Sequence, residues 1–107
     1  MTSIRMRWSR LEMKIDGHAD WGPKGADLVC CAVSTLIQTL VACLEEGEKR
    51  GRLSAEIKAA DGMYKEIRAN PNMGTLGETK AYFRSCMTGL KMLARDYPKN
   101  VSVMEVE

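Results

Sequence analysis

The sequence predicts an α+β fold in which one mostly antiparallel sheet carries two helices on its surface. Five short segments alternate apolar and polar side chains with the period of two that is typical of half-buried strands. Two longer segments repeat apolar residues at helical spacing. The segments follow one another in the order ββαββαβ, so hairpins alternate with helices as in an α+β domain. A chain of 107 residues is long enough for one compact domain, which we expect to span residues 1–107.

The first two strands are expected over residues 3–8 and 11–16, which would form a hairpin. Apolar side chains alternate with polar ones in both segments: Ile4, Met6, Trp8, Leu11, Met13 and Ile15. Ser9 and Arg10 join the two strands, although neither residue favours the positive φ of a tight hairpin turn. Trp8 is expected to anchor the hairpin, either in the core or on the surface.

A segment rich in glycine and in other residues that break regular structure follows the second strand. His18, the only histidine of the chain, precedes it, and residues 19–26 show no periodicity, which predicts a loop. Trp21 lies within this loop. Its ring can form an aromatic wall beside a substrate, or it can pack on its neighbours in a plain connector, and the sequence leaves both interpretations open.

The longest uncharged run of the chain predicts a helix over about residues 27–48. Its apolar residues recur at helical spacing: Val29, Val33, Leu36, Leu40 and Leu44. Asp27 is suited to cap its first turn. The uncharged run is shorter than the roughly 20 residues of a membrane span and contains hydroxyl and amide side chains, so we expect a buried helix and no membrane contact. Since apolar or small groups cover more than one side, one side should face the sheet and another should contact a second copy in a homodimer.

Two further strands are expected after this helix. Residues 53–59 and 63–69 both alternate apolar and polar side chains. Between them, Asp61-Gly62 is a strong signal for a hairpin turn, because both residues tolerate positive φ. These segments are therefore predicted to form the third and fourth strands of the same sheet.

A second helix and a last strand complete the chain. Thr75 and Glu78 have the spacing of a capping box, and Pro98 ends the helical pattern. The expected apolar stripe of this helix is Leu76, Tyr82, Phe83, Cys86, Met87, Leu90, Leu93 and Tyr97. Residues 101–106 alternate again and supply the last strand.

Cys30 and His18 form a candidate catalytic pair. Cys30 falls in the first turn of the expected helix, where unpaired N–H groups and the helix dipole favour the nucleophilic thiolate. If the loop brings His18 over the helix start, the imidazole can take the proton of the thiol and later give one to a leaving amine. The same N–H groups can stabilise the oxyanion that forms when a carbonyl is attacked. Ser34 lies one turn beyond Cys30, where it can hold a substrate or support the thiolate.

The residues around this pair resemble the signature of the ribosomal-processing cysteine protease family, called Prp. The matching segments are Gly17-His18-Ala19, Gly25-Ala26-Asp27-Leu28-Val29-Cys30 and Ala32-Val33-Ser34, and the spacing from His18 to Cys30 also agrees. The resemblance implies that His18 and Cys30 are the catalytic dyad of a thiol protease. Candidate substrate-binding or supporting residues are Gly17, Trp21, Gly25, Asp27 and Ser34. Cys31 departs from the family pattern, which usually has a small residue such as alanine there, but the spacing favours Cys30 as the reacting sulfur.

The resemblance also implies a substrate. Family members remove a short N-terminal extension from large-subunit ribosomal protein L-twenty-seven, and relatives in phages process head proteins with a similar cleavage motif. The expected partner is therefore an extension peptide of a ribosomal or phage structural protein. The competing interpretation is a catalytically silent module that binds such a peptide without cutting it, because a lone histidine and cysteine also occur near each other by chance.

Composition and charge argue against other classes of function. A net charge of +2, with acids interspersed among the basic residues, gives no reason to expect direct nucleic-acid binding. No cofactor is implied, since the glycine-rich segment lacks the spacing of a phosphate-binding loop. A metal site is not expected either, because the four cysteines include no Cys-x-x-Cys pair, and a disulfide between Cys30 and Cys31 would require local unwinding of the helix. These cysteines, with no signal-like apolar segment in residues 1–10, predict a reducing, cytoplasmic location.

Overall fold

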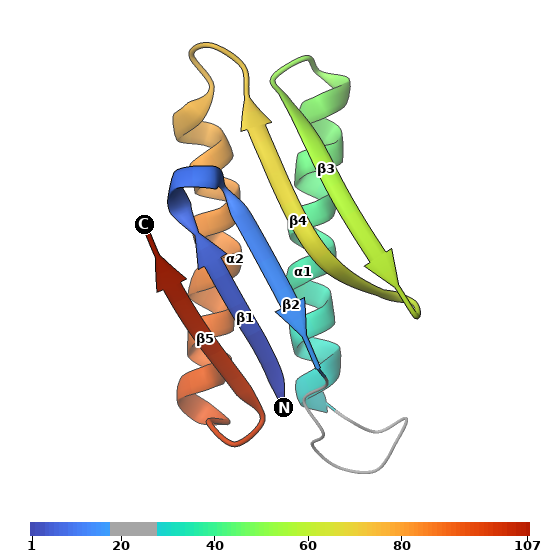
Figure 1. Cartoon of the computed structure of the whole chain (residues 1–107), viewed down its shortest axis with the longest axis vertical. Helices are drawn as coiled ribbons and strands as arrows, with labels where there is room; N and C mark the ends of the chain where they lie inside the picture. The colour runs from blue at the N-terminus through green and yellow to red at the C-terminus, as the bar shows by residue number, and fades with distance from the viewer. Residues whose placement is uncertain (18–27) are drawn as a thin grey trace.

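The computed structural model describes residues 1–17 and 28–107 of the chain. A five-stranded, mostly antiparallel sheet carries both helices on one of its faces (Figure 1). The elements are β1 (Thr2–Arg7), a short 3-10 helix η1 (Trp8–Arg10), β2 (Glu12–Asp16), α1 (Leu28–Lys49), β3 (Leu53–Ala60), β4 (Met63–Pro71), α2 (Leu76–Asp96) and β5 (Val101–Val106). The predicted α+β class and the predicted order ββαββαβ are therefore confirmed.

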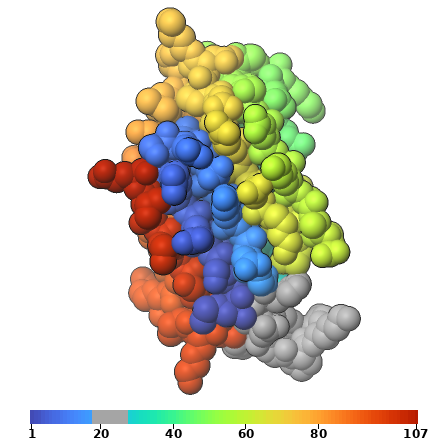
Figure 2. Space-filling model, in the orientation of Figure 1, coloured from blue at the N-terminus to red at the C-terminus, as the bar shows by residue number. Residues whose placement is uncertain are grey.

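The strands are arranged in the order β3-β4-β2-β1-β5. All neighbours are antiparallel except β1 and β5, which run parallel and bring the two ends of the chain into one half of the sheet. The register places apolar residues opposite one another on the helix-facing side, as in the pairs Ile4 with Ile15 and Met13 with Ile67. These side chains are buried against the helices, because alternate residues of a strand point to the same face. The opposite face of the sheet has no layer of described residues over it (Figures 1 and 2).

The connection between β1 and β2 differs from the predicted one. β1 ends at Arg7 rather than at residue 8, and Trp8 begins the 3-10 turn. Leu11 then adopts a positive φ of 45°, so the chain reverses without the glycine or asparagine that a tight hairpin needs. Trp8 is a half-buried surface anchor: its Nε1–H donates to Glu105 at 3.0 Å, and the Arg84 guanidinium lies 5.8 Å from the ring centroid.

The helix α1 has one buried side and one exposed side. Its buried residues confirm the helical spacing read from the sequence: Val29, Val33, Ile37, Leu40, Val41, Leu44 and Gly47. Leu36, which was expected in this set, is half-buried. By length and composition α1 is apolar enough to cross a membrane, and 33% of its most apolar window is buried within the molecule. The exposed side begins at Leu28, which is 68% accessible, and continues through Cys31, Thr35 and Thr39.

The start of α2 corrects the predicted capping box. The Thr75 side chain makes no cap hydrogen bond. Its hydroxyl instead donates to two carbonyl oxygens, that of Arg52 at 2.7 Å and that of Asn72 at 2.8 Å. Glu78 instead accepts from Arg52, with 2.6 Å between Nε and Oε1. Both residues of the expected box therefore form hydrogen bonds with Arg52, which directly precedes β3. Two ends of the expected apolar stripe are also exposed, Leu76 at 49% and Tyr97 at 37%.

Candidate active site

A small cavity of about 70 Å³ lies beside the first turns of α1. Cys30 and Ser34 both line it, one helical turn apart, as their spacing predicts. The other residues of its wall come from β1, β2, α1, the turn between β3 and β4, and the start of β4: Thr2, Ile15, Val33, Ile37, Gln38, Gly62, Met63 and Tyr64. The fold therefore brings two of the predicted site residues to one hollow.

This cavity occupies an opening in the sheet. β2 pairs with β4 only from Glu12 to Lys14, whereas β4 continues its pairing with β3 as far as Met63. A register shift between Lys58 and Ala59 falls in this same part of the hairpin. The end of the β3–β4 hairpin consequently diverges from β2 (Figure 1), and the start of α1 lies behind the opening.

The surroundings of Cys30 are neutral and partly closed. Its side chain is half-buried and packs against the hydrophobic core. The described helix begins at Leu28, so Cys30 is in the first turn, where backbone N–H groups lack intrahelical carbonyl partners. This turn contains no acidic residue, and no charged side chain is among the described residues that line the cavity. Such a position suits an anion, because no carboxylate among the described residues of the first turn or of the cavity wall opposes the N–H groups and the helix dipole.

The other three cysteines have different environments. All four cysteines carry thiols; Cys31 is exposed, Cys43 is half-buried and Cys86 is buried. Burial raises the pKa of the Cys86 thiol to about 12, and its Sγ donates to the Leu36 carbonyl oxygen at 3.5 Å. Cys86 is therefore a core residue rather than a nucleophile. Within residues 1–17 and 28–107, no group of three or more histidine, cysteine or acidic side chains is arranged to hold a metal ion.

Gly17 is the last described residue before His18. Its φ is +79°, and a Cβ at this position would collide with the carbonyl oxygen of Met1. Glycine at this motif position thus has a structural cause, since the chain turns out of β2 directly against the beginning of β1. The predicted site residues His18, Trp21, Gly25 and Asp27 lie outside the described residues.

Several residues of the cavity wall were missed by sequence reasoning. Gln38 could have been found, because it lies one turn beyond Ser34 on the face of α1 that carries Cys30. Met63 and Tyr64 carry no local signal of this kind, since they approach α1 only through the pairing of distant strands. The available hint was the predicted hairpin at Asp61-Gly62, whose strands are longer than β2 and must extend past it.

Comparisons with known proteins agree with this arrangement. The family model described as "Cysteine protease Prp" matches residues 1–102. The essential ribosomal processing protease Prp of Staphylococcus aureus, solved with a covalently linked product peptide, has a TM-score of 0.78 at 19% identity, covering 99% of this chain and 100% of that chain. The same protease with a substrate peptide gives a TM-score of 0.70 at 15% identity, with coverage of 99% and 100%. A Streptococcus mutans protein gives 0.62 at 26% identity, with coverage of 98% and 93%. No curated protein matches the chain.

Proposed function

Because the chain belongs to the Prp family of cysteine proteases, we propose that Cys30 is the nucleophile and His18 the acid–base partner of peptide-bond hydrolysis. The observation that carries this proposal is the position of Cys30, in the first turn of α1 and in the wall of a cavity. Gly17 directly follows β2 and lies against Met1 and Thr2, of which Thr2 lines this cavity. His18 is the next residue of the chain. Cys86, by contrast, is buried and its pKa is raised to about 12, so it is unsuited to the same role.

The proposed reaction proceeds through an acyl-enzyme. His18 takes the proton of the Cys30 thiol, and the sulfur attacks the carbonyl carbon of the scissile bond. The carbonyl oxygen becomes an oxyanion, which backbone N–H groups at the start of α1 stabilise. The imidazolium of His18 then gives its proton to the leaving amine, and a thioester remains on Cys30. Water, deprotonated by His18, hydrolyses the thioester and restores the thiol, so no cofactor is required.

The lining of the cavity supports an apolar residue beside the scissile bond. Its described wall includes Ile15, Val33, Ile37 and Met63 and no charged side chain. An apolar side chain placed there would leave water for an apolar surface, which is favourable. We propose that the substrate is the N-terminal extension of large-subunit ribosomal protein L-twenty-seven, which is supported by family membership and by the ribosomal processing role of the similar Staphylococcus aureus protease. Four cysteine thiols support a reducing, cytoplasmic location.

The exposed side of α1 supports a homodimer. Leu28, Cys31, Thr35 and Thr39 form an uncharged stripe along this helix. A second copy could cover this stripe with the same surface, as two-fold symmetric dimers do. The proposed partners are therefore the extension peptide and a second copy of the chain.

Cleavage assays with purified variants test the dyad. Extension peptides are incubated with the wild-type protein, and the masses of the products locate the cut. We expect Cys30→Ala and His18→Ala to abolish cleavage, while Cys31→Ala, the adjacent thiol, leaves turnover largely intact. Peptide binding without cleavage by the wild type would establish the silent binding module instead. An inactive Cys31→Ala together with an active Cys30→Ser would reverse the assignment of the nucleophile, and preference for phage head-protein peptides would change the substrate.

A further inference from the structure

The open face of the sheet is charge-paired over β2, β3 and β4. Lys14 and Lys58 lie on either side of Glu66, with nitrogen–oxygen distances of 3.7 and 3.3 Å. Arg68 likewise stands in register between Glu12 of β2 and Glu56 of β3. Opposite charges directly across neighbouring strands stabilise a sheet. Glu66 is thus paired on both sides, and Arg68 has a carboxylate on either side in register, although its buried Nε has no hydrogen-bond partner among the described residues.

The other half of the same face breaks this rule. Arg5 of β1 stands directly opposite Lys14, a like-charged pair, and its neighbour on β5 is Met104. Arg7 stands opposite Glu12, which satisfies the rule, and its neighbour on β5 is Val106. Neither arginine forms an ion pair with any residue in the described portion of the chain. A like-charged cross-strand pair is destabilising. Glu66 offsets the charge of Lys14, whereas Arg5 has no ion pair among the described residues.

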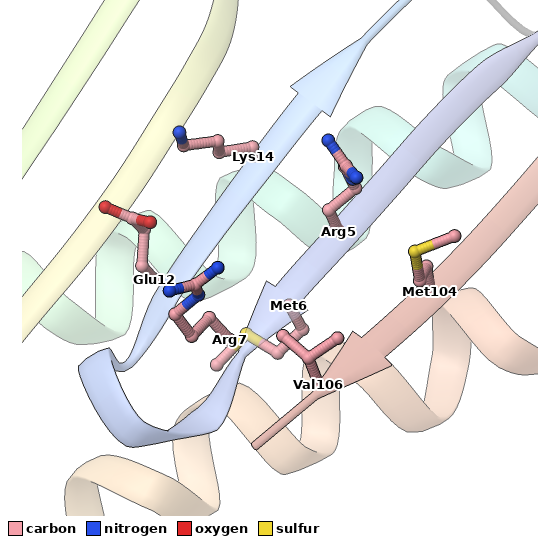
Figure 3. Close-up of a pocket in the computed structure, with 7 residues that line it drawn as sticks. All are labelled: Arg5, Met6, Arg7, Glu12, Lys14, Met104 and Val106. Carbon is pink, nitrogen blue, oxygen red and sulfur yellow. The ribbon is translucent and has the colours of Figure 1, made fainter.

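A hollow lies where Arg5 and Arg7 meet β5. It has a volume of about 140 Å³ and is lined by Arg5, Met6, Arg7, Glu12, Lys14, Met104 and Val106. Figure 3 shows Arg5 and Arg7 of β1 beside Met104 and Val106 of β5, with Lys14 of β2 on the other side of β1. Met104 is 54% exposed and Val106 is 46% exposed. The hollow thus combines three cations and one carboxylate with an accessible apolar margin.

We propose that this hollow is a docking site for an acidic segment of a partner protein, in which carboxylates are interspersed with apolar side chains. Guanidinium groups bind carboxylates through two parallel hydrogen bonds, and such bonds are stronger when both groups are charged. The partner's carboxylates would offset the repulsion between Arg5 and Lys14. Its apolar side chains would cover the exposed parts of Met104 and Val106. The charge pattern and the apolar margin therefore specify one kind of occupant.

A peptide suits this surface better than a nucleic acid does. Glu12 lies within the hollow and would repel a phosphate backbone. Aromatic side chains are the usual platform on which bases of single-stranded nucleic acid stack, and none lines this hollow among the residues that the structure describes. The hollow shares no lining residue with the cavity beside Cys30, so docking here goes beyond the proposed proteolytic function.

Binding of fluorescent peptides to the full chain tests the docking site. The probes are a peptide of alternating glutamate and leucine, its glutamate–serine counterpart and oligouridine. We expect the glutamate–leucine peptide to bind, and Arg5→Gln or Arg7→Gln to weaken its binding about tenfold each, since a hydrogen bond to a charged group contributes enough for such a change. Lys58→Gln is the matched control, because it also removes one positive charge from the same face, beside Glu66 and outside the hollow, and it should bind like the wild type.

A second variant tests the apolar part of the surface. Met104→Ser should weaken binding of the glutamate–leucine peptide and leave the weaker binding of the glutamate–serine peptide unchanged. Absence of peptide binding, an equal loss in Lys58→Gln, or tighter binding of oligouridine would overturn the proposal. Cleavage of the extension peptide by Arg5→Gln should equal that of the wild type, so failure of the docking site can be distinguished from failure of the proposed protease activity.

Discussion

Individual sulfur atoms of this chain differ in accessibility and in their neighbours. Cys30 lies in the first turn of α1 beside a cavity, while Cys86 is enclosed by the core and its pKa is raised to about 12 by burial. The thiolate is the form that reacts with iodoacetamide. We therefore expect Cys30 to be alkylated first and Cys86 last when the folded protein is treated near neutral pH. Mass spectrometry of peptides taken at successive times measures the order.

Two comparisons make this order informative. The Cys31→Ala variant removes the adjacent exposed thiol, so that modification located at residues 30–31 by peptide fragmentation reports on Cys30 alone. Unfolding in urea exposes every thiol, and the rates at Cys30 and Cys86 should then converge. Alkylation of Cys86 as fast as Cys30 in the folded protein would contradict the assignment of Cys86 to the core.

At the scale of elements, the end of β2 is constrained by the beginning of β1. Gly17 has a positive φ and faces the carbonyl oxygen of Met1, so Gly17→Ala introduces both backbone strain and a collision. Positive φ costs an L-residue about 1–2 kcal/mol. A forced backbone shift adds about 1–3 kcal/mol. Urea denaturation should therefore show a loss of unfolding free energy equal to the sum of these two effects.

Gly51→Ala is the matched control for this substitution. Gly51 has a similar φ of +71°, but a Cβ there meets no atom within 4 Å. This variant should show the strain alone, about 1–2 kcal/mol. The difference between the two variants measures the collision at the β1–β2 end, and equal losses in both would show that Met1 moves aside without cost.

Local sequence patterns predicted the regular elements because those patterns arise from the core itself. Met13 and Ile15 are buried where alternation placed them, and the residues of α1 follow the same logic. The 3-10 turn at Trp8 and the failed capping box at Thr75 were not predictable in this way. In both cases groups far away in the sequence determine the conformation. Trp8 contacts Glu105 and Arg84, and the carbonyl oxygen of Arg52 accepts a hydrogen bond from the Thr75 hydroxyl.

The residues of the candidate site likewise include some that local spacing predicts and others that depend on distant segments. Cys30 and Ser34 share one helix, so their spacing was sufficient to predict that they lie on one surface. Met63 and Tyr64 line the same cavity because the part of β4 that precedes Glu66 does not pair with β2 and lies near α1 instead. Strand divergence of this kind depends on pairing between segments far apart in the chain, and no local motif records it.

At the scale of the whole molecule, the two surfaces of the helical layer differ in charge. The exposed side of α1 is uncharged from Leu28 through Thr39, whereas α2 exposes Arg84 and Lys91. We expect the α1 side to form the homodimer. Thr39→Arg would place a guanidinium without a partner in that interface. Leaving a charge buried and unpaired in an interface costs roughly 2–5 kcal/mol of binding free energy. Sedimentation velocity should then show a dissociation constant raised more than about tenfold.

Thr88→Arg on α2 separates this effect from damage to a helix. Both threonines are exposed, and both donate to the carbonyl oxygen four residues earlier, Thr39 to Thr35 at 2.7 Å and Thr88 to Arg84 at 2.8 Å. The two substitutions therefore remove the same helical hydrogen bond and add the same charge, and they differ only in the surface that they alter. If α1 forms the interface, Thr88→Arg remains dimeric while Thr39→Arg dissociates. A wild-type protein that sediments as a monomer, or equal dissociation of the two variants, would show that the uncharged side of α1 does not form a homodimer interface.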